Sequence, residues 1–152
     1  MKRITVLAVL VLSMAVLAAC APKPEEINAV VNDFFGQWKA GNTSKMTDLM
    51  TSEVYLGMFL VEMPSGASSV NTPDKRVPAL TIAEFLITDL SLDPDSTLSI
   101  TKTDVYDGYA FVESVFDLSP DDSPDVKIPF TFHLKETDDG WKIYLIYYST
   151  EF

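Results

Sequence analysis

The chain has 152 residues, a single cysteine and a formal net charge of −11 at pH 7. This length is typical of one folded domain, and a lone cysteine excludes a disulfide within the chain. The excess of acidic side chains argues against nucleic acid as a partner, because binding to phosphates needs clustered Lys and Arg.

The first part of the chain is typical of a secretory signal peptide. Lys2 and Arg3 give it a basic start, residues 4–19 carry no charge, and the stretch ends in small residues. The uncharged run is shorter than the roughly 20 residues that a membrane-spanning helix needs. We therefore expect residues 1–19 to be removed, which leaves an even more acidic mature chain.

Leu17-Ala18-Ala19-Cys20 resembles the lipobox of bacterial lipoproteins. The resemblance implies cleavage between Ala19 and Cys20 and attachment of fatty acyl chains, such as palmitate, at Cys20. Several acyl chains on one residue hold a protein durably on a membrane, whereas one chain holds it only weakly. The alternative is an ordinary signal peptide followed by a free thiol.

The residue after this cysteine points to a location. Ala21, where some lipoproteins carry Asp, resembles the pattern of outer-membrane lipoproteins. We expect the protein on the periplasmic side of the outer membrane if the envelope has two membranes, and otherwise on the outer face of the plasma membrane. Residues 20–26 comprise the lipidated cysteine and a short spacer with two prolines, so residues 27–152 make up the folded domain.

The domain begins with two predicted helices. Pro24 suits the first turn of a helix, and Gly41 suits its left-handed end. Between them an apolar face recurs at helical spacing, formed by Ile27, Val30, Val31, Phe34, Phe35 and Trp38. Asn42 or Thr43 then provides the cap of a short second helix.

The middle of the chain gives weaker signals. Residues 53–63 are apolar and predict a strand or an extended segment. Residues 64–78 are rich in Pro, Gly and Ser and predict a surface loop or a lid. Thr81 and Glu84 have the spacing of a capping box, which predicts a third helix from Thr81 to about Asp89.

The rest of the chain predicts strands joined by hairpins. Asp107-Gly108 and Asp139-Gly140 are strong turn signals, each between two strand-like stretches. Apolar and polar side chains alternate over residues 126–135, which predicts one buried and one polar face. The last stretch is apolar on both faces and should lie inside the sheet. The predicted strands cover residues 98–105, 109–118, 126–135 and 141–148.

Helices followed by antiparallel strands predict an α+β domain, with the N-terminal helices packed on one face of a curved antiparallel sheet. This order resembles the nuclear transport factor 2-like, or cystatin-like cone, group, which includes SnoaL-like proteins. The resemblance rests on residues 34–42, on Leu49-Met50 and on the closing residues 139–143. It implies a sheet wrapped around a conical pocket that the first helix closes. Some members are isomerases or dehydratases and many only bind, and no catalytic residue transfers to this chain by position.

Aromatic side chains are the candidates for lining such a pocket: Phe34, Trp38, Phe59, Tyr109 and Phe111. Glu113 shares a strand face with the last two of these rings. A carboxylate among rings would have a raised pKa and suit proton abstraction, with Tyr55 or Tyr144 as the partner. The alternative is that Glu113 faces solvent and pairs with Lys102 or Lys142 across strands.

No other residue pattern indicates chemistry. His133, the only histidine, lies on the polar face of its strand, where we expect it to be exposed and without a catalytic role. Aspartates gather at residues 89–95 and 121–125, but they lack the spacing of a calcium loop and suit turns. The chain has no Cys/His set for zinc, no glycine-rich phosphate loop and no Gly-x-Ser-x-Gly nucleophile, so we predict no metal and no cofactor.

Three functions remain open on these grounds. The first, which we favour, is an envelope-anchored module that binds without catalysis. It would take a small apolar ligand in the pocket, or a protein through the sheet face, either a second copy or an envelope protein. The second is an isomerase- or dehydratase-like enzyme that uses Glu113 and a tyrosine. The third is a structural or assembly accessory of the envelope.

Overall fold

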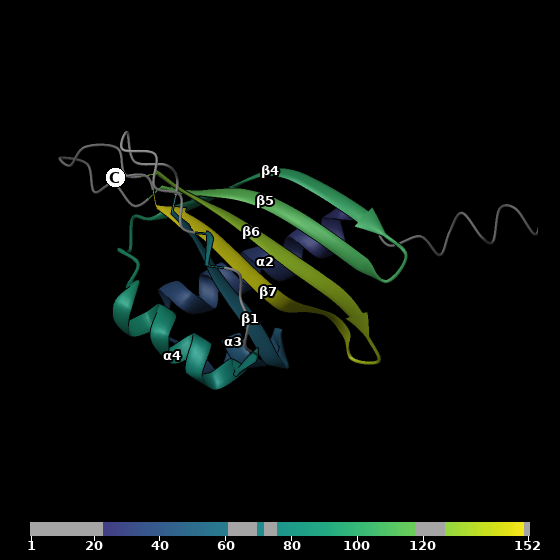
Figure 1. Ribbon diagram of the computed structural model, residues 1–152, viewed down its shortest axis with the longest axis horizontal. Coiled ribbons are helices and arrows are strands. Elements are labelled where there is room, and N and C mark those ends of the chain that lie inside the picture. Colours follow the sequence, from purple (N-terminus) through teal and green to yellow (C-terminus); the bar gives the residue numbers. More distant parts are fainter. Residues whose placement is uncertain (1–22, 61–69, 72–75, 118–126, 151–152) are drawn as a thin grey trace, which may run out of the picture.

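The computed structural model describes residues 23–60, 70–71, 76–117 and 127–150 (Figure 1). Its helices are α2 (Pro24–Lys39), α3 (Thr43–Asp48) and α4 (Ala79–Asp89). Its strands are β1 (Met50–Leu60), β2 (Val70–Asn71), β3 (Arg76–Pro78), β4 (Thr97–Tyr106), β5 (Tyr109–Asp117), β6 (Lys127–Thr137) and β7 (Gly140–Thr150). The predicted signal peptide, Cys20 and the aspartates at 121–125 lie outside the described residues. None of the described helices is long and apolar enough to cross a membrane.

α2 follows the boundaries that the sequence predicts. Pro24 takes the first helical turn, where its missing N–H removes no helical hydrogen bond. Gly41 lies beyond the last turn with φ 65°, a left-handed conformation that glycine adopts without strain. The buried side of α2 consists of Ile27, Val31, Phe34, Phe35 and Trp38. The prediction of a long amphipathic first helix is therefore confirmed.

The sequence predicts the start of α3 correctly, but not the start of α4. The Asn42 side chain accepts a hydrogen bond of 3.3 Å from the backbone N–H of Lys45, so Asn42 caps α3 as expected. α4 begins at Ala79 rather than at Thr81, and its N-cap is Pro78, which makes no side-chain hydrogen bond. The prediction of a capping box at Thr81 is therefore wrong. Ala79 is buried, so the helix begins with a residue that packs in the core, directly after Pro78.

The sheet has the strand order β2-β1-β7-β6-β5-β4, and β3 also pairs with β1. β1 and β7 run parallel, whereas the other pairs are antiparallel. β7 lies between β1 and β6, which confirms that the last strand is internal. Residues 70–71 and 76–78 are strands rather than the predicted loop, because both pair with β1. The other residues of the stretch 64–75 lie outside the described residues.

Alternation along the strands gives the sheet two different faces. We call the face that packs against the helices the inner face, and the opposite one the outer face. In Figure 1, α2 passes behind the sheet, across the inner face. In β5 the buried positions alternate with more exposed ones, so Ala110 and Val112 lie on the inner face while Tyr109 and Glu113 lie on the outer face.

α2 is fixed to the inner face by aromatic contacts. The ring centroids of Phe34 and Phe132 are 5.9 Å apart, and those of Trp38 and Phe130 are 5.8 Å apart. Phe34 and Phe132 are fully buried in the main core. Burying a Phe side chain contributes about 1.5–3 kcal/mol, so these contacts hold the helix on the sheet. The α+β class, with helices on a curved and mostly antiparallel sheet, is confirmed.

Candidate functional site

A cavity of about 200 Å³ lies between the inner face of the sheet and the C-terminal ends of α2 and α4. Three sheet strands and the residues that follow α4 contribute to it. Its lining consists of Trp38, Asp89, Leu90, Ser91, Leu92, Phe116, Ile128, Phe130 and Tyr148. Apolar side chains dominate this set, with polar groups near one end of α4. Such a concave, mainly apolar site with few polar groups is typical of small-molecule binding.

Four aromatic rings make up much of the cavity wall, and they pack against one another. The Trp38 ring centroid is 5.3 Å from that of Phe116, and the Phe130 centroid is 4.1 Å from Phe116 and 5.4 Å from Tyr148. Trp38 Nε1 donates a hydrogen bond of 2.9 Å to the backbone oxygen of Leu86 in α4. This bond satisfies the buried indole N–H and fixes the orientation of the ring. The wall is therefore held in place before any ligand arrives.

The cavity has few polar groups of its own. Burial raises the pKa of the Tyr148 hydroxyl, so the group stays protonated at neutral pH. Within the described part of the chain, neither the Tyr148 hydroxyl nor the Asp89 carboxylate has a hydrogen-bond or ion-pair partner. Asp89 is exposed and lies at the end of α4. Both groups are thus available to a ligand, one inside the cavity and one where it meets solvent.

The outer face of the sheet carries a second cluster of rings. We call Tyr106, Tyr109, Phe111, His133, Tyr144 and Tyr147 the outer ring cluster. The His133 ring centroid is 4.4 Å from Phe111 and 5.7 Å from Tyr147, and Tyr109 is 6.2 Å from Tyr144. Tyr106 is 57% exposed and Tyr109 is 50% exposed. These rings pack on one another and form an apolar surface that no other described element covers.

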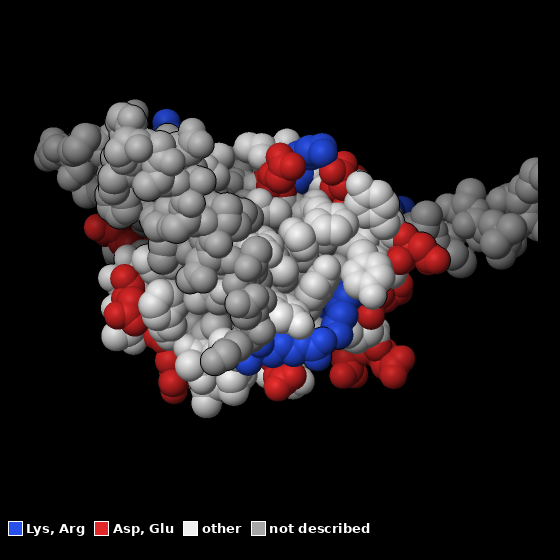
Figure 2. All heavy atoms as spheres, in the orientation of Figure 1, with Lys and Arg blue, Asp and Glu red and all other residues white. Residues whose placement is uncertain are grey.

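Charged residues lie around the outer ring cluster rather than within it. In Figure 2 the part of this face that grey atoms do not cover is an uncharged area, with basic and acidic side chains along its visible borders. Strand alternation and register place on this face the basic residues Arg76, Lys102, Lys127, Lys135 and Lys142, and the acidic residues Glu53, Asp104, Glu113 and Asp117. The remaining basic residues in the described part are Lys23, Lys39 and Lys45. Over these described strand positions the outer face is therefore close to neutral, and the acidic excess of the described residues lies in the helices, loops and hairpin turns.

The predicted catalytic candidates do not meet in the cavity. Glu113 is exposed on the outer face, opposite Lys102 across the strands, and the Lys102 ammonium contacts Asp104. Tyr144 also lies on the outer face, where burial is the main cause that raises its pKa. The arrangement that would have made Glu113 a buried base is absent, because its strand turns this parity away from the helices. Tyr55 likewise lies on this face.

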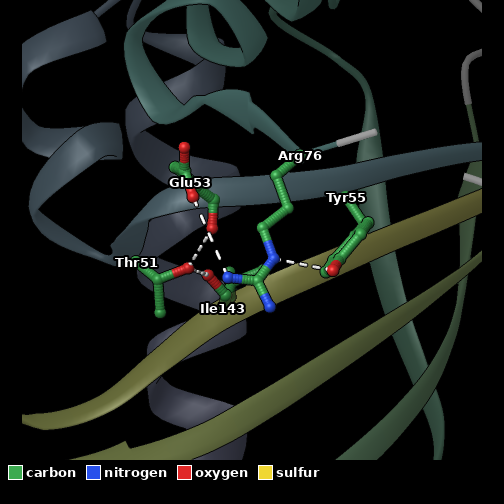
Figure 3. Close-up of polar contacts among 5 residues, drawn as sticks. All are labelled: Thr51, Glu53, Tyr55, Arg76 and Ile143. Carbon is green, nitrogen blue, oxygen red and sulfur yellow. Dashed lines mark hydrogen bonds and ion pairs between the residues drawn. The ribbon is translucent and has the colours of Figure 1, made fainter. Parts of the chain in front are cut away.

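The Tyr55 hydroxyl is engaged by Arg76, as Figure 3 shows. Arg76 Nε donates a hydrogen bond of 2.6 Å to Tyr55 Oη, and Arg76 Nη1 lies 3.9 Å from Glu53 Oε2. This hydrogen bond is the main cause that raises the pKa of the Arg76 guanidinium. Thr51 Oγ1 donates to the backbone oxygen of Glu53 at 2.5 Å. The contacts of Arg76 join β1 and β3, and they engage Tyr55 on the outer face rather than in the cavity.

The pocket candidates divide between the two faces. Trp38 lines the cavity, whereas Phe34 is fully buried in the core beside it. Tyr109 and Phe111 lie in the outer ring cluster and not in the cavity, which corrects their placement. The side chain of Phe59 lies outside the described residues. His133 is on the outer face as expected, but it is half-buried rather than exposed, and burial lowers its pKa.

Most of the cavity lining was not among the sequence-based candidates. Phe116, Ile128, Phe130 and Tyr148 lie on the buried parity of their strands, and that alternation is the signal that identifies them. The residues at the end of α4 carry no comparable signal. No group of three or more His, Cys, Asp or Glu side chains in the described part could hold a metal ion.

Comparison with known proteins supports the fold. No protein-family model matches the sequence, and no curated protein matches it. An NTF2-like protein of unknown function from Methylobacillus flagellatus KT is 13% identical, with a TM-score of 0.61 over 84% of this chain and 91% of its own. A second from Shewanella baltica OS155 is 16% identical, with a TM-score of 0.56 over 84% and 92%.

A third such protein, from Shewanella oneidensis MR-1, is 14% identical, with a TM-score of 0.56 over 82% of this chain and 97% of its own. At these identities the likeness concerns the fold alone. The chain therefore has the same fold as these NTF2-like proteins, which is the fold that the resemblance in its sequence implies.

Proposed function

We propose that this domain is a non-catalytic binding module that accepts a small, largely apolar ligand in the cavity between α2, α4 and the sheet. We also propose that Cys20 holds it at the cell envelope through lipid. The observation that carries the proposal is the cavity itself, with Trp38 fixed by its hydrogen bond to Leu86 and three further rings in contact. An apolar cavity of about 150 Å³ binds benzene. One of about 200 Å³ is large enough for one ring with a short substituent.

The positions of the ionisable groups favour binding over catalysis. A catalytic base needs a place within reach of the substrate and a partner that orients it. Glu113, Tyr55 and Tyr144 lie on the outer face, away from the cavity lining. In the cavity lining, the ionisable groups are Asp89, which is exposed, and Tyr148, whose hydroxyl is protonated. This set supports orientation of a ligand more than proton abstraction.

A variant that fills the cavity tests this proposal. Leu92→Trp adds a ring to the lining, so we expect it to weaken binding of tert-butylbenzene at least about tenfold, as measured by calorimetry. Leu80→Trp is the matched control, because Leu80 is 51% exposed on α4 and is not part of the lining. Equal binding by both variants, or no binding by the unaltered chain, would overturn the proposal.

Anchoring at Cys20 has a separate test. Mass spectrometry of the native protein should find a chain that begins at Cys20 and carries acyl groups. Cys20→Ser should release the protein from the membrane fraction, because the hydroxyl cannot form the thioether. A Cys20→Ser protein that stays in the membrane fraction, or native protein with a free thiol, would contradict the lipid anchor. Neither result would affect the proposal that the cavity binds a ligand.

The outer ring cluster favours a second binding role, the docking of a second copy of the chain. Two copies of an acidic protein repel each other through most of their surfaces. The outer face is the part where that repulsion is weakest, because its basic and acidic side chains nearly balance. In a two-fold dimer the same patch serves both partners, so borders of opposite sign can face one another. We therefore propose sheet-to-sheet pairing of two copies over the outer ring cluster.

Two charge variants of matched exposure test the pairing. Tyr109 is 50% exposed in the outer ring cluster and Leu80 is 51% exposed on α4. Tyr109→Lys should weaken self-association at least about tenfold in sedimentation equilibrium, whereas Leu80→Lys should leave it unchanged. A chain that stays monomeric at high concentration would contradict the pairing. If crosslinking then captured an envelope protein through Tyr109, the face would belong to that partner instead.

A further inference from the structure

We propose that the cavity selects a small organic cation, with a single apolar ring seated among the aromatic side chains and a substituted ammonium group beside Asp89. This inference rests on the proposed function, because it names the chemical class of ligand for the same cavity. It follows from the charges and partial charges that the described lining residues carry.

The formal charge on the cavity lining is negative. Asp89 is the charged residue of the lining, it is exposed, and it has no ion pair in the described part of the chain. Lys39 follows Trp38 in α2, but its ammonium is engaged elsewhere. Lys39 Nζ donates a hydrogen bond of 2.8 Å to the backbone oxygen of Ser96 and lies 5.6 Å from the Phe35 ring centroid. Neither Ser96 nor Phe35 lines the cavity, so Asp89 is not neutralised there.

The end of α4 adds partial negative charge at the same place. A helix C-terminus carries roughly half an elementary negative charge on carbonyl groups that lack helical partners. α4 has no basic residue in its last turn, so none of its own side chains offsets this charge. The indole of Trp38 engages the Leu86 carbonyl, whereas Asp89 and Leu90 lie where the helix ends at the cavity. α2 differs, because Lys39 occupies its last turn.

The aromatic wall favours the same sign. The faces of aromatic rings carry partial negative charge and attract cations, most strongly for Trp. Trp38, Phe116, Phe130 and Tyr148 all line the cavity. Aromatic rings that can attract a cation, a carboxylate without an ion pair in the described part of the chain, and a helix C-terminus together favour a cation over an anion. The volume of about 200 Å³ limits the ligand to about one ring with a short substituent.

Three ligands of the same shape and different charge test the inference. Phenyltrimethylammonium, tert-butylbenzene and benzenesulfonate have the same number of non-hydrogen atoms and carry positive, zero and negative charge. Binding to the full-length chain is measured by calorimetry, with the Trp38 indole N–H followed by NMR. We expect the cation to bind at least about tenfold more tightly than the anion. The affinity of the cation should also equal or exceed that of the neutral ligand, because the rings and Asp89 offset the hydration that the cation loses on binding.

Asp89→Asn distinguishes the contribution of the carboxylate to binding from that of the apolar wall. It should weaken binding of the cation about threefold and leave the neutral ligand unchanged, since an exposed ion pair contributes modestly. Asp93→Asn is the matched control, because Asp93 is an exposed aspartate close in sequence that does not line the cavity. Added salt should weaken binding of phenyltrimethylammonium, because salt screens its attraction to Asp89, and it should leave binding of tert-butylbenzene unchanged.

The outcomes distinguish failure of cation selection from failure of ligand binding in the cavity. If tert-butylbenzene binds but the two charged ligands bind equally, or if Asp89→Asn acts no differently from Asp93→Asn, cation selection is overturned and the apolar site stands. If none of the three ligands binds, or if Leu92→Trp binds all of them as well as the unaltered chain, the proposed function falls together with the inference.

Discussion

The two faces of the sheet are built from the same strands but differ in what covers them. Across the β5–β6 pair, Val112 lies opposite Phe132 on the inner face, and Phe111 lies opposite His133 on the outer face. Phe132 is fully buried under α2, whereas Phe111 is half-buried among rings that remain open to solvent. Aromatic content alone therefore does not define the core. The helices decide which set of rings becomes the core and which remains a surface for binding.

The same comparison extends to charge. Acidic side chains on the helical side include Glu25, Glu26 and Asp33 in α2, with Asp48 ending α3 and Asp89 ending α4. On the outer face acidic and basic residues are interspersed around the rings. In the described part of the chain, the acidic excess thus lies on the helices and in the loops and hairpin turns, while the strand positions of the outer face are close to neutral. Two pairs of substitutions, each with one member on either face, compare the faces directly.

The largest expected difference concerns two phenylalanines on neighbouring strands. Phe132→Ala removes a fully buried ring and should lower the free energy of unfolding by about 3–5 kcal/mol. Phe111→Ala removes a half-buried ring and should lower it by about 1 kcal/mol. Urea denaturation followed by circular dichroism measures both. A loss above about 3 kcal/mol for Phe111→Ala, growing with protein concentration, would instead show that this ring is buried between two copies.

A second pair compares hydrogen bonds. Trp38→Phe keeps a ring in the cavity wall but removes the buried 2.9 Å bond to Leu86, leaving a carbonyl unsatisfied. We expect a loss of about 1–3 kcal/mol in the free energy of unfolding. Tyr55→Phe removes the 2.6 Å bond from Arg76 at an exposed site. Water replaces that bond, so the change should stay within about 0.5 kcal/mol. Equal losses from both substitutions would contradict the assignment of Tyr55 to a solvated site on the outer face.

Local signals in the sequence were enough to predict most of the elements. Pro24 and Gly41 bracket α2, and Gly108 and Gly140, with φ of 72° and 93°, form the two hairpin turns. The apolar character of residues 141–148 on both faces correctly predicts an internal strand. These features depend on backbone conformation and alternation, which each short stretch determines by itself.

The site was harder to predict, because it depends on which parity meets the helices. β5 carries aromatic rings on both parities, with Phe111 on one and Phe116 on the other, so alternation does not say which side is covered. The cavity also draws on the ends of α2 and α4, which are distant in sequence and meet only through packing. Asp89 therefore looked like one turn-forming aspartate among several.

The smallest expected effect concerns the histidine of the outer ring cluster. Phe111 of β5 and Tyr144 and Tyr147 of β7 face His133, and Lys135 lies on the same face of its own strand. Burial among these groups lowers the pKa of His133 below its ordinary value of 6.5. The folded chain therefore binds this proton less readily than the unfolded chain does.

The sign of the pH effect follows from that difference. The stability contributed by neutral His133 is fully present above its ordinary pKa, and it is lost as the pH falls through the lower pKa of the folded state. The loss should be below about 1 kcal/mol, because solvent still reaches a half-buried imidazole. His133→Gln should remove this part of the pH dependence, as judged by urea denaturation of both proteins at matched pH values. If a second copy covers the outer face, it excludes the remaining water from His133. The difference between the two proteins would then grow with protein concentration, and a difference independent of concentration would count against the pairing.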